Sequence, residues 1–196
     1  MKTRIDFVSN SSSCSFIVIA SSGKLCDVAN AKKCSEKHFL YSIPSKEYGC
    51  LEFGWQDEMY NSLEDKLNWC GIVLLELYAA CRSIEMKAGI LGKKAAEVNS
   101  KYTSYRDKYV QWKNMLEKVC KERLGIGIYV NLDWINLFGG EDLDSYAYAG
   151  LFGCCIDHQS SIFEKPANGK MFETEDALYN FLAYEESYIQ CGNDNG

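Results

Sequence analysis

The sequence predicts an α+β fold in which a mostly antiparallel sheet packs with a long antiparallel helical hairpin and one short C-terminal helix. This fold class is predicted from three observations. Side chains alternate as in strands near the N-terminus, two long heptad-spaced patterns occupy the middle, and short strand-like runs with a capped helix lie near the C-terminus. We expect a single domain over residues 1–196. Its N-terminal strands occupy 1–54, the hairpin 57–123, and the C-terminal strands and short helix 125–196.

The N-terminal strands are predicted from alternation and from breaks between runs. Charged side chains alternate with uncharged ones over Lys2–Val8, and this period of two residues is typical of a half-buried strand. Ser9–Ser13 interrupts the pattern, a second strand follows over Cys14–Ala20, and Ser21–Gly23 forms a turn. Shorter strands are expected over His38–Ile43 and Gly49–Gly54.

Two helices with regular apolar seams are predicted in the middle of the chain. The seam of the first comprises Leu63, Leu67, Cys70, Leu74, Leu77, Cys81 and Ile84, and that of the second Ala95, Val98, Tyr102, Tyr105, Tyr109, Trp112, Leu116 and Val119. Gly89 and Gly92 mark the turn between them, and about 30 residues per helix correspond to roughly 45 Å. The aromatic second seam and the apolar run Ile72–Leu75 favour burial on several sides, and a projecting arm is the functional alternative.

After the hairpin we expect short strands, two loops and one helix. The strands are predicted at Gly125–Val130, Tyr146–Ile156 and Tyr188–Cys191, and the loops at Trp134–Leu143 and Asp157–Gly169. The helix is expected over Phe172–Ala183. Thr174 is its N-cap, and Glu175 and Asp176 lie in its first turn, where carboxylates favour the positive end of the helix dipole.

Composition indicates a globular cytoplasmic protein, without membrane attachment or cofactor. The hydrophobic content of 47% and aromatic content of 13% argue against disorder, and no apolar run is long enough for a secretory signal or a membrane span. The ten cysteines are scattered, without the close pairs of a zinc site, so we interpret them as reduced thiols and predict no metal.

The charges are segregated along the chain. Residues 93–123 carry nine basic and four acidic side chains, whereas residues 124–196 carry two basic and twelve acidic ones. One interpretation is a basic surface for phosphate-bearing partners and an acidic surface for a basic groove on another protein. The alternative is that the two parts face each other and their charges cancel.

Two polar clusters are candidate sites. Asp157, His158 and Ser160 follow a predicted strand and are catalytic candidates for a small hydrolase or ligand-binding domain, or else a hydrogen-bonded strand end. Asn10, Ser11 and Ser12 could cradle a phosphate in a polar pocket with Asn193 and Asp194, or else form a serine-rich hairpin turn.

Charged residues supply the binding candidates. The acidic ones are Glu141, Asp142, Asp144, Glu173, Glu175 and Asp176, which could imitate nucleic-acid phosphates or lie solvated in loops. The basic ones are Lys94, Lys101 and Lys108, spaced by seven along the second predicted helix. They would form a basic stripe that either contacts phosphate groups or keeps the protein soluble. Nucleic acid is a less favoured partner than a host protein.

Residues 7–16, Phe-Val-Ser-Asn-Ser-Ser-Ser-Cys-Ser-Phe, resemble an N-terminal signature of small proteins of bacteria and their phages, with Cys14 replacing a serine. Segments at 156–160, 187–189 and 192–195 are similar to segments of the same group. The resemblance implies no activity. It implies a phage or mobile-element setting, and a shared location for both chain ends and the Asp157 loop.

We therefore expect a non-enzymatic phage or mobile-element protein that binds a host protein, such as an inhibitor of a CRISPR effector or another host defence system. The hydrolase with Asp157, His158 and Ser160 is the first alternative. A virion or assembly component that forms a homo-oligomer through the hairpin is the second.

Overall fold

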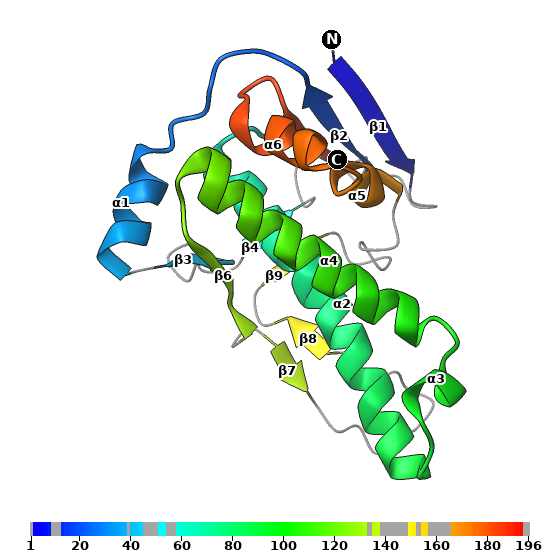
Figure 1. The fold of residues 1–196 in the computed structure, drawn as a ribbon. Helices are drawn as coiled ribbons and strands as arrows, with labels where there is room; N and C mark the ends of the chain where they lie inside the picture. The colour runs from blue at the N-terminus through cyan, green and yellow to red at the C-terminus, as the bar shows by residue number, and fades with distance from the viewer. Residues whose placement is uncertain are drawn as a thin grey trace.

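The computed structural model describes residues 2–8, 13–38, 40–44, 51–53, 58–132, 135–137, 149–151, 154–156 and 166–193 (Figure 1). Within these ranges an antiparallel sheet and a long helix packed against other helices confirm the predicted α+β class.

The main sheet has four antiparallel strands in the order β1-β2-β10-β5, namely β1 (Lys2–Val8), β2 (Ser13–Ala20), β10 (Tyr188–Asn193) and β5 (Glu58–Tyr60). β1 and β2 pair in register from Lys2 opposite Ala20 to Val8 opposite Cys14. The C-terminal strand β10 then pairs with β2 on its other side. Both ends of the described chain therefore belong to one sheet.

The central element is α2 (Leu63–Leu91), a helix of 29 residues, or about 43 Å. It begins at Ser62, whose hydroxyl accepts a hydrogen bond from the Asp65 backbone N–H. It ends at Gly92, which adopts the left-handed conformation with φ of 61°. Residues 72–75 are fully buried, because helices and strands contact α2 on several sides.

The second arm of the hairpin is interrupted, where one continuous helix was predicted. It consists of α3 (Ala95–Val98), α4 (Tyr102–Val119) and a π-helical turn, η2 (Cys120–Leu124). Asn99 adopts an extended conformation between the helices, and its side-chain oxygen accepts from the Lys101 backbone N–H. Short polar side chains compete for backbone groups in this way, which interrupts the heptad pattern.

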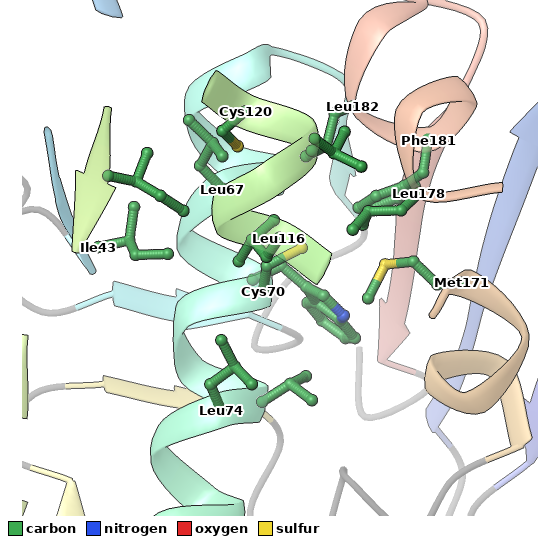
Figure 2. Packing of buried hydrophobic residues seen from close by; sticks show 14 of the residues in the cluster. Ile43, Leu67, Cys70, Leu74, Leu116, Cys120, Met171, Leu178, Phe181 and Leu182 are labelled. Carbon is green, nitrogen blue, oxygen red and sulfur yellow. The ribbon is translucent and has the colours of Figure 1, made fainter. Parts of the chain in front are cut away.

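Helices α5 (Pro166–Met171) and α6 (Glu175–Ala183) lie between the main sheet and the hairpin. They contact β1 and β2 on one side, and α6 contacts α2 and α4 on the other. Figure 2 shows the resulting core, in which Leu67 and Cys70 of α2 and Leu116 of α4 lie near the α6 side chains Leu178 and Leu182. Most of the first predicted seam and the end of the second, namely Trp112, Leu116 and Val119, thus belong to the core.

Three further strand pairs lie beside α2. They are the parallel pairs of β3 (Tyr41–Ile43) with β6 (Ile128–Val130) and of β4 (Leu51–Phe53) with β9 (Cys154–Ile156), and the antiparallel pair of β7 (Ile135–Leu137) with β8 (Ala149–Leu151).

Three local predictions were wrong. His38 ends a helix, α1 (Ala29–His38), that the N-terminal strand prediction missed, because its alanine- and lysine-rich sequence favours a helix without a strong apolar face. The loop expected over Trp134–Leu143 contains β7, whose partner β8 is too distant in sequence to signal the pairing. The loop expected over Asp157–Gly169 contains the start of α5, with Pro166 at a first-turn position that suits proline.

By length and composition α2 could cross a membrane, and 67% of its most apolar window is buried inside the protein. Core helices of globular proteins pass the same test. Its burial against α4, α6 and the small strand pairs accounts for its composition without a bilayer.

Candidate functional site

Several predicted site residues lie outside the described residues. These are the catalytic candidates Asp157, His158 and Ser160, the acids Glu141, Asp142 and Asp144, and the polar residues Asn10, Ser11, Ser12 and Asp194. The backbone of Asn193 is described, and it pairs with Ser13 at one end of the main sheet. The strand before Asp157, β9, pairs with β4 in a different sheet.

The described acidic candidates are ion-paired with basic side chains. Glu175 Oε1 lies 2.7 Å from Lys118 Nζ, and Asp176 Oδ1 lies 2.7 Å from Arg123 Nη1. Glu173 pairs with Lys170 at 3.0 Å. Two of these three pairs join the acidic start of α6 to the basic end of the α4–η2 segment. At these residues the segregated charges face each other, as the cancellation interpretation requires.

Arg123 also stacks on an aromatic ring, since its guanidinium carbon lies 3.7 Å from the centre of the Tyr179 ring. The same side chain therefore holds α6 through a carboxylate and through a cation–π contact. Surface ion pairs each contribute about 1 kcal/mol or less, so their chief effect is to neutralise this acidic surface.

The three predicted stripe lysines do not share one helix. Lys94 precedes α3 and Lys101 precedes α4, and only Lys108 lies within α4. The Lys108 ammonium lies 5.9 Å from the centre of the Trp112 ring. The break at Asn99 separates Lys94 from the surface formed by the other two.

The far end of the hairpin exposes two adjacent apolar side chains. Ile90 is 70% exposed and Leu91 is 44% exposed, both in the last turn of α2. The chain then turns at Gly92 and continues with Lys93 and Lys94, which are exposed. Among the described residues no carboxylate lies within ion-pair distance of either lysine. In Figure 1 this hairpin end lies at the opposite end of α2 from the main sheet.

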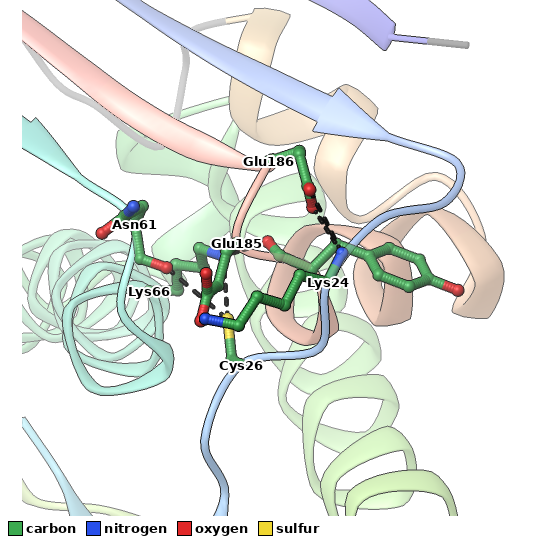
Figure 3. A network of polar contacts seen from close by, with 7 residues as sticks. Lys24, Cys26, Asn61, Lys66, Glu185 and Glu186 are labelled. Atoms are coloured by element: carbon green, nitrogen blue, oxygen red, sulfur yellow. Dashed lines mark hydrogen bonds and ion pairs between the residues drawn. The ribbon is translucent and has the colours of Figure 1, made fainter.

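The opposite end of α2 contains a buried polar cluster around Lys66 (Figure 3). Lys66 is fully buried, and its ammonium donates hydrogen bonds to the Tyr184 carbonyl oxygen at 2.6 Å and to the Cys26 sulfur at 3.4 Å. The Cys26 thiol in turn donates to the Asn61 carbonyl oxygen at 3.5 Å. Lysines are almost never fully buried unless paired, yet no carboxylate of the described residues lies within 4.0 Å of Lys66.

An exposed pair of charges borders this cluster. Lys24 Nζ lies 2.9 Å from Glu185 Oε1, and the Lys24 backbone N–H donates to both carboxylate oxygens of Glu186. Gly23 leaves room for that carboxylate, because a Cβ there would lie 1.8 Å from Glu186 Oε2. The Lys24 N–H bond holds the pKa of Glu186 below its usual value.

Burial moves the two central pKa values toward each other. Desolvation lowers the pKa of Lys66 and raises the pKa of Cys26. Each group partly opposes the shift of the other, because a thiolate stabilises an ammonium and the reverse. Desolvation thus disfavours the ammonium–thiolate state relative to the amine–thiol state.

The sequence analysis did not identify this cluster. A usable signal was present, since Lys66 lies three residues after Leu63 and four before Cys70, on the apolar face of the helix. Nothing local connects Lys66 with Cys26, which lies 40 positions earlier.

Within the described ranges, no group of three or more histidine, cysteine or acidic side chains is placed to hold a metal ion. No protein-family model, no curated protein and no solved structure matches the chain.

Proposed function

We propose that the protein acts by protein–protein binding and that the hairpin end, defined by Ile90, Leu91, Lys93 and Lys94, is its contact surface. The observation that carries the proposal is the exposure of Ile90 and Leu91 beside lysines that lack carboxylate partners among the described residues. Adjacent exposed apolar side chains bordered by charges are typical of interaction surfaces.

The charge of the hairpin end favours a partner with an acidic surface. Lys93 and Lys94 attract carboxylates and guide the approach, while burial of Ile90 and Leu91 supplies most of the affinity. The acidic start of α6 is a weaker candidate, because Glu175 and Asp176 already pair with Lys118 and Arg123.

The resemblance of residues 7–16 to a phage-associated signature favours a bacterial host protein as the partner. We propose a host defence protein, such as a CRISPR effector, as the first class to test. The alternative reaction site at Asp157, His158 and Ser160 lies outside the described residues, and no observation on the described ones favours it.

The test begins with tagged full-length chain in a bacterial lysate, with captured proteins identified by mass spectrometry. The captured partner is then purified and titrated with the wild-type chain and two double variants. One variant combines Ile90→Ser with Leu91→Ser, and the other combines Lys93→Glu with Lys94→Glu. We expect each to weaken binding about tenfold or more, and the lysine contribution to decrease at high salt.

Lys121→Glu is the matched control, because Lys121 is equally exposed but lies in η2, far along the second arm. This variant should bind like wild type. Undiminished binding by both double variants would refute the assignment of the surface. Size-exclusion chromatography of the purified chain tests the assembly alternative, which predicts a multimer that Ile90→Ser with Leu91→Ser disrupts.

A further inference from the structure

The Cys26–Lys66 pair combines a nucleophilic amine and a thiol next to a surface segment. Cys26 is only 6% exposed, but its neighbour Leu25 is 59% exposed and Asp27 is also exposed. The thiol therefore points inward from a surface segment, beside the exposed Lys24–Glu185 pair in Figure 3.

The other described cysteines lack such a partner. Five cysteines have described surroundings, and all five are free thiols. Cys26 is the one among them that is hydrogen-bonded to an amine, with 3.4 Å between Sγ and Nζ. Cys70 and Cys120 lie fully buried in the apolar core, away from oxidants.

We propose that Cys26 and Lys66 form a covalent sulfur–nitrogen crosslink when the protein meets hydrogen peroxide. In the first step the Cys26 thiolate attacks peroxide and the O–O bond breaks, which gives a sulfenic acid and a hydroxide; the hydroxide combines with the proton that the thiol released to form one water. The sulfur is oxidised by two electrons and the peroxide is reduced. In the second step the uncharged amine attacks the sulfur, the S–O bond breaks, and the hydroxyl leaves with an amine proton as water.

The surroundings of the pair favour the second step. Desolvation lowers the pKa of Lys66, which increases the fraction of amine that carries the lone pair needed for attack. The bond from Lys66 to the Tyr184 carbonyl oxygen holds the nitrogen beside the sulfur.

The crosslink would join the segment before α1 to the first turn of α2. It lies at the end of α2 opposite the hairpin end, so it is independent of the proposed binding function. Because thiols cleave sulfur–nitrogen bonds, the modification is reversible by a reductant such as dithiothreitol.

The test uses the reduced full-length chain, treated with hydrogen peroxide, denatured, alkylated at free thiols and digested with trypsin. Cleavage after lysine and arginine normally separates residues 25–32, 47–66 and 67–82. We expect residues 25–32 joined to an uncleaved 47–82, with the loss of two hydrogens, roughly 2 Da, and alkylation at Cys50, Cys70 and Cys81. Treatment with dithiothreitol after the peroxide step and before alkylation should abolish the joined product.

This pattern excludes a disulfide, which has the same mass change. A disulfide would leave Lys66 open to trypsin and one of the three cysteines in 47–82 without alkylation. Either that result, or Cys26 recovered only as free thiol, sulfinic acid or sulfonic acid in an unjoined peptide, would overturn the proposal.

Two variants sharpen the test. Lys66→Met keeps a long buried side chain but removes the amine, so the Cys26 sulfenic acid should persist and react with dimedone. Cys34→Ser, the matched control at a half-buried cysteine, should leave the joined peptide at its wild-type yield. Should Lys66→Met fail to fold, the wild-type peptide map and the Cys34→Ser control decide the question.

Discussion

Gly71 and Gly89 lie on the same helix, and alanine at these two positions should have opposite effects on stability. In a helix interior, Gly→Ala ordinarily stabilises by about 0.8–1 kcal/mol. A Cβ at Gly71 would lie 2.9 Å from the Pro44 nitrogen and 3.0 Å from the Ile43 carbonyl carbon, whereas a Cβ at Gly89 meets nothing within 4 Å. The obstructing atoms at Gly71 are backbone atoms, so the strand end must move.

Overpacking of this kind costs about 1–3 kcal/mol, and Ile43 is fully buried, which limits relaxation. We therefore expect Gly71→Ala to destabilise by about 1–2 kcal/mol and Gly89→Ala to stabilise by about 0.5–1 kcal/mol. Urea denaturation of the wild type and the two variants, under reducing conditions, measures the difference. A Gly71→Ala variant as stable as Gly89→Ala would refute the close packing of Ile43 and Pro44 on α2.

Two further predictions concern the core. Phe172 is 1% exposed and stacks on Trp112 with ring centres 4.7 Å apart, so Phe172→Ala should lower the free energy of unfolding by about 3–5 kcal/mol, measured by urea denaturation. A loss under about 1 kcal/mol would contradict the stacking. Burial raises the pKa of Cys120 to about 12 and that of Cys81 to about 11. The unfolded thiols ionise near their usual pKa of 9.0, so between that pH and the folded pKa the native state holds protons that the unfolded state has released. Stability should therefore fall as pH rises above about 9, by up to about 1.4 kcal/mol per pH unit for each thiol. Cys120→Ala should reduce that slope in urea titrations, and an unchanged slope would count against the burial of Cys120.

The elements that sequence analysis located best have strong local signals. The β1–β2 alternation, the seam of α2 and the Thr174 cap of α6 each depend on neighbouring residues, and each was recovered with bounds close to those observed. The break at Asn99 was missed because the heptad pattern continues through it. Local hydrogen bonds of Asn99 there outweigh the apolar spacing.

In the candidate sites, too, the sequence carried the local signals, and contacts between distant residues were visible only in the structure. The predicted turn at Gly89 and Gly92 was only partly correct, because Gly89, Ile90 and Leu91 belong to α2 and the turn begins at Gly92. The exposure of Ile90 and Leu91 is visible only in the structure. The Lys66 cluster had a helical-face signal but no local link to Cys26 or Tyr184. Its parts come from three segments, which only the packed chain brings together.

By itself the sequence determined the α+β class, the long apolar central helix and the segregation of basic and acidic residues, because periodicity and composition are properties of the linear chain. Tertiary structure decided how these parts meet. It placed β10 beside β2 and set Glu175 and Asp176 against Lys118 and Arg123. It also buried Lys66 against Cys26. Such contacts join residues far apart in sequence, and their free energy depends on burial and distance, which no local pattern encodes.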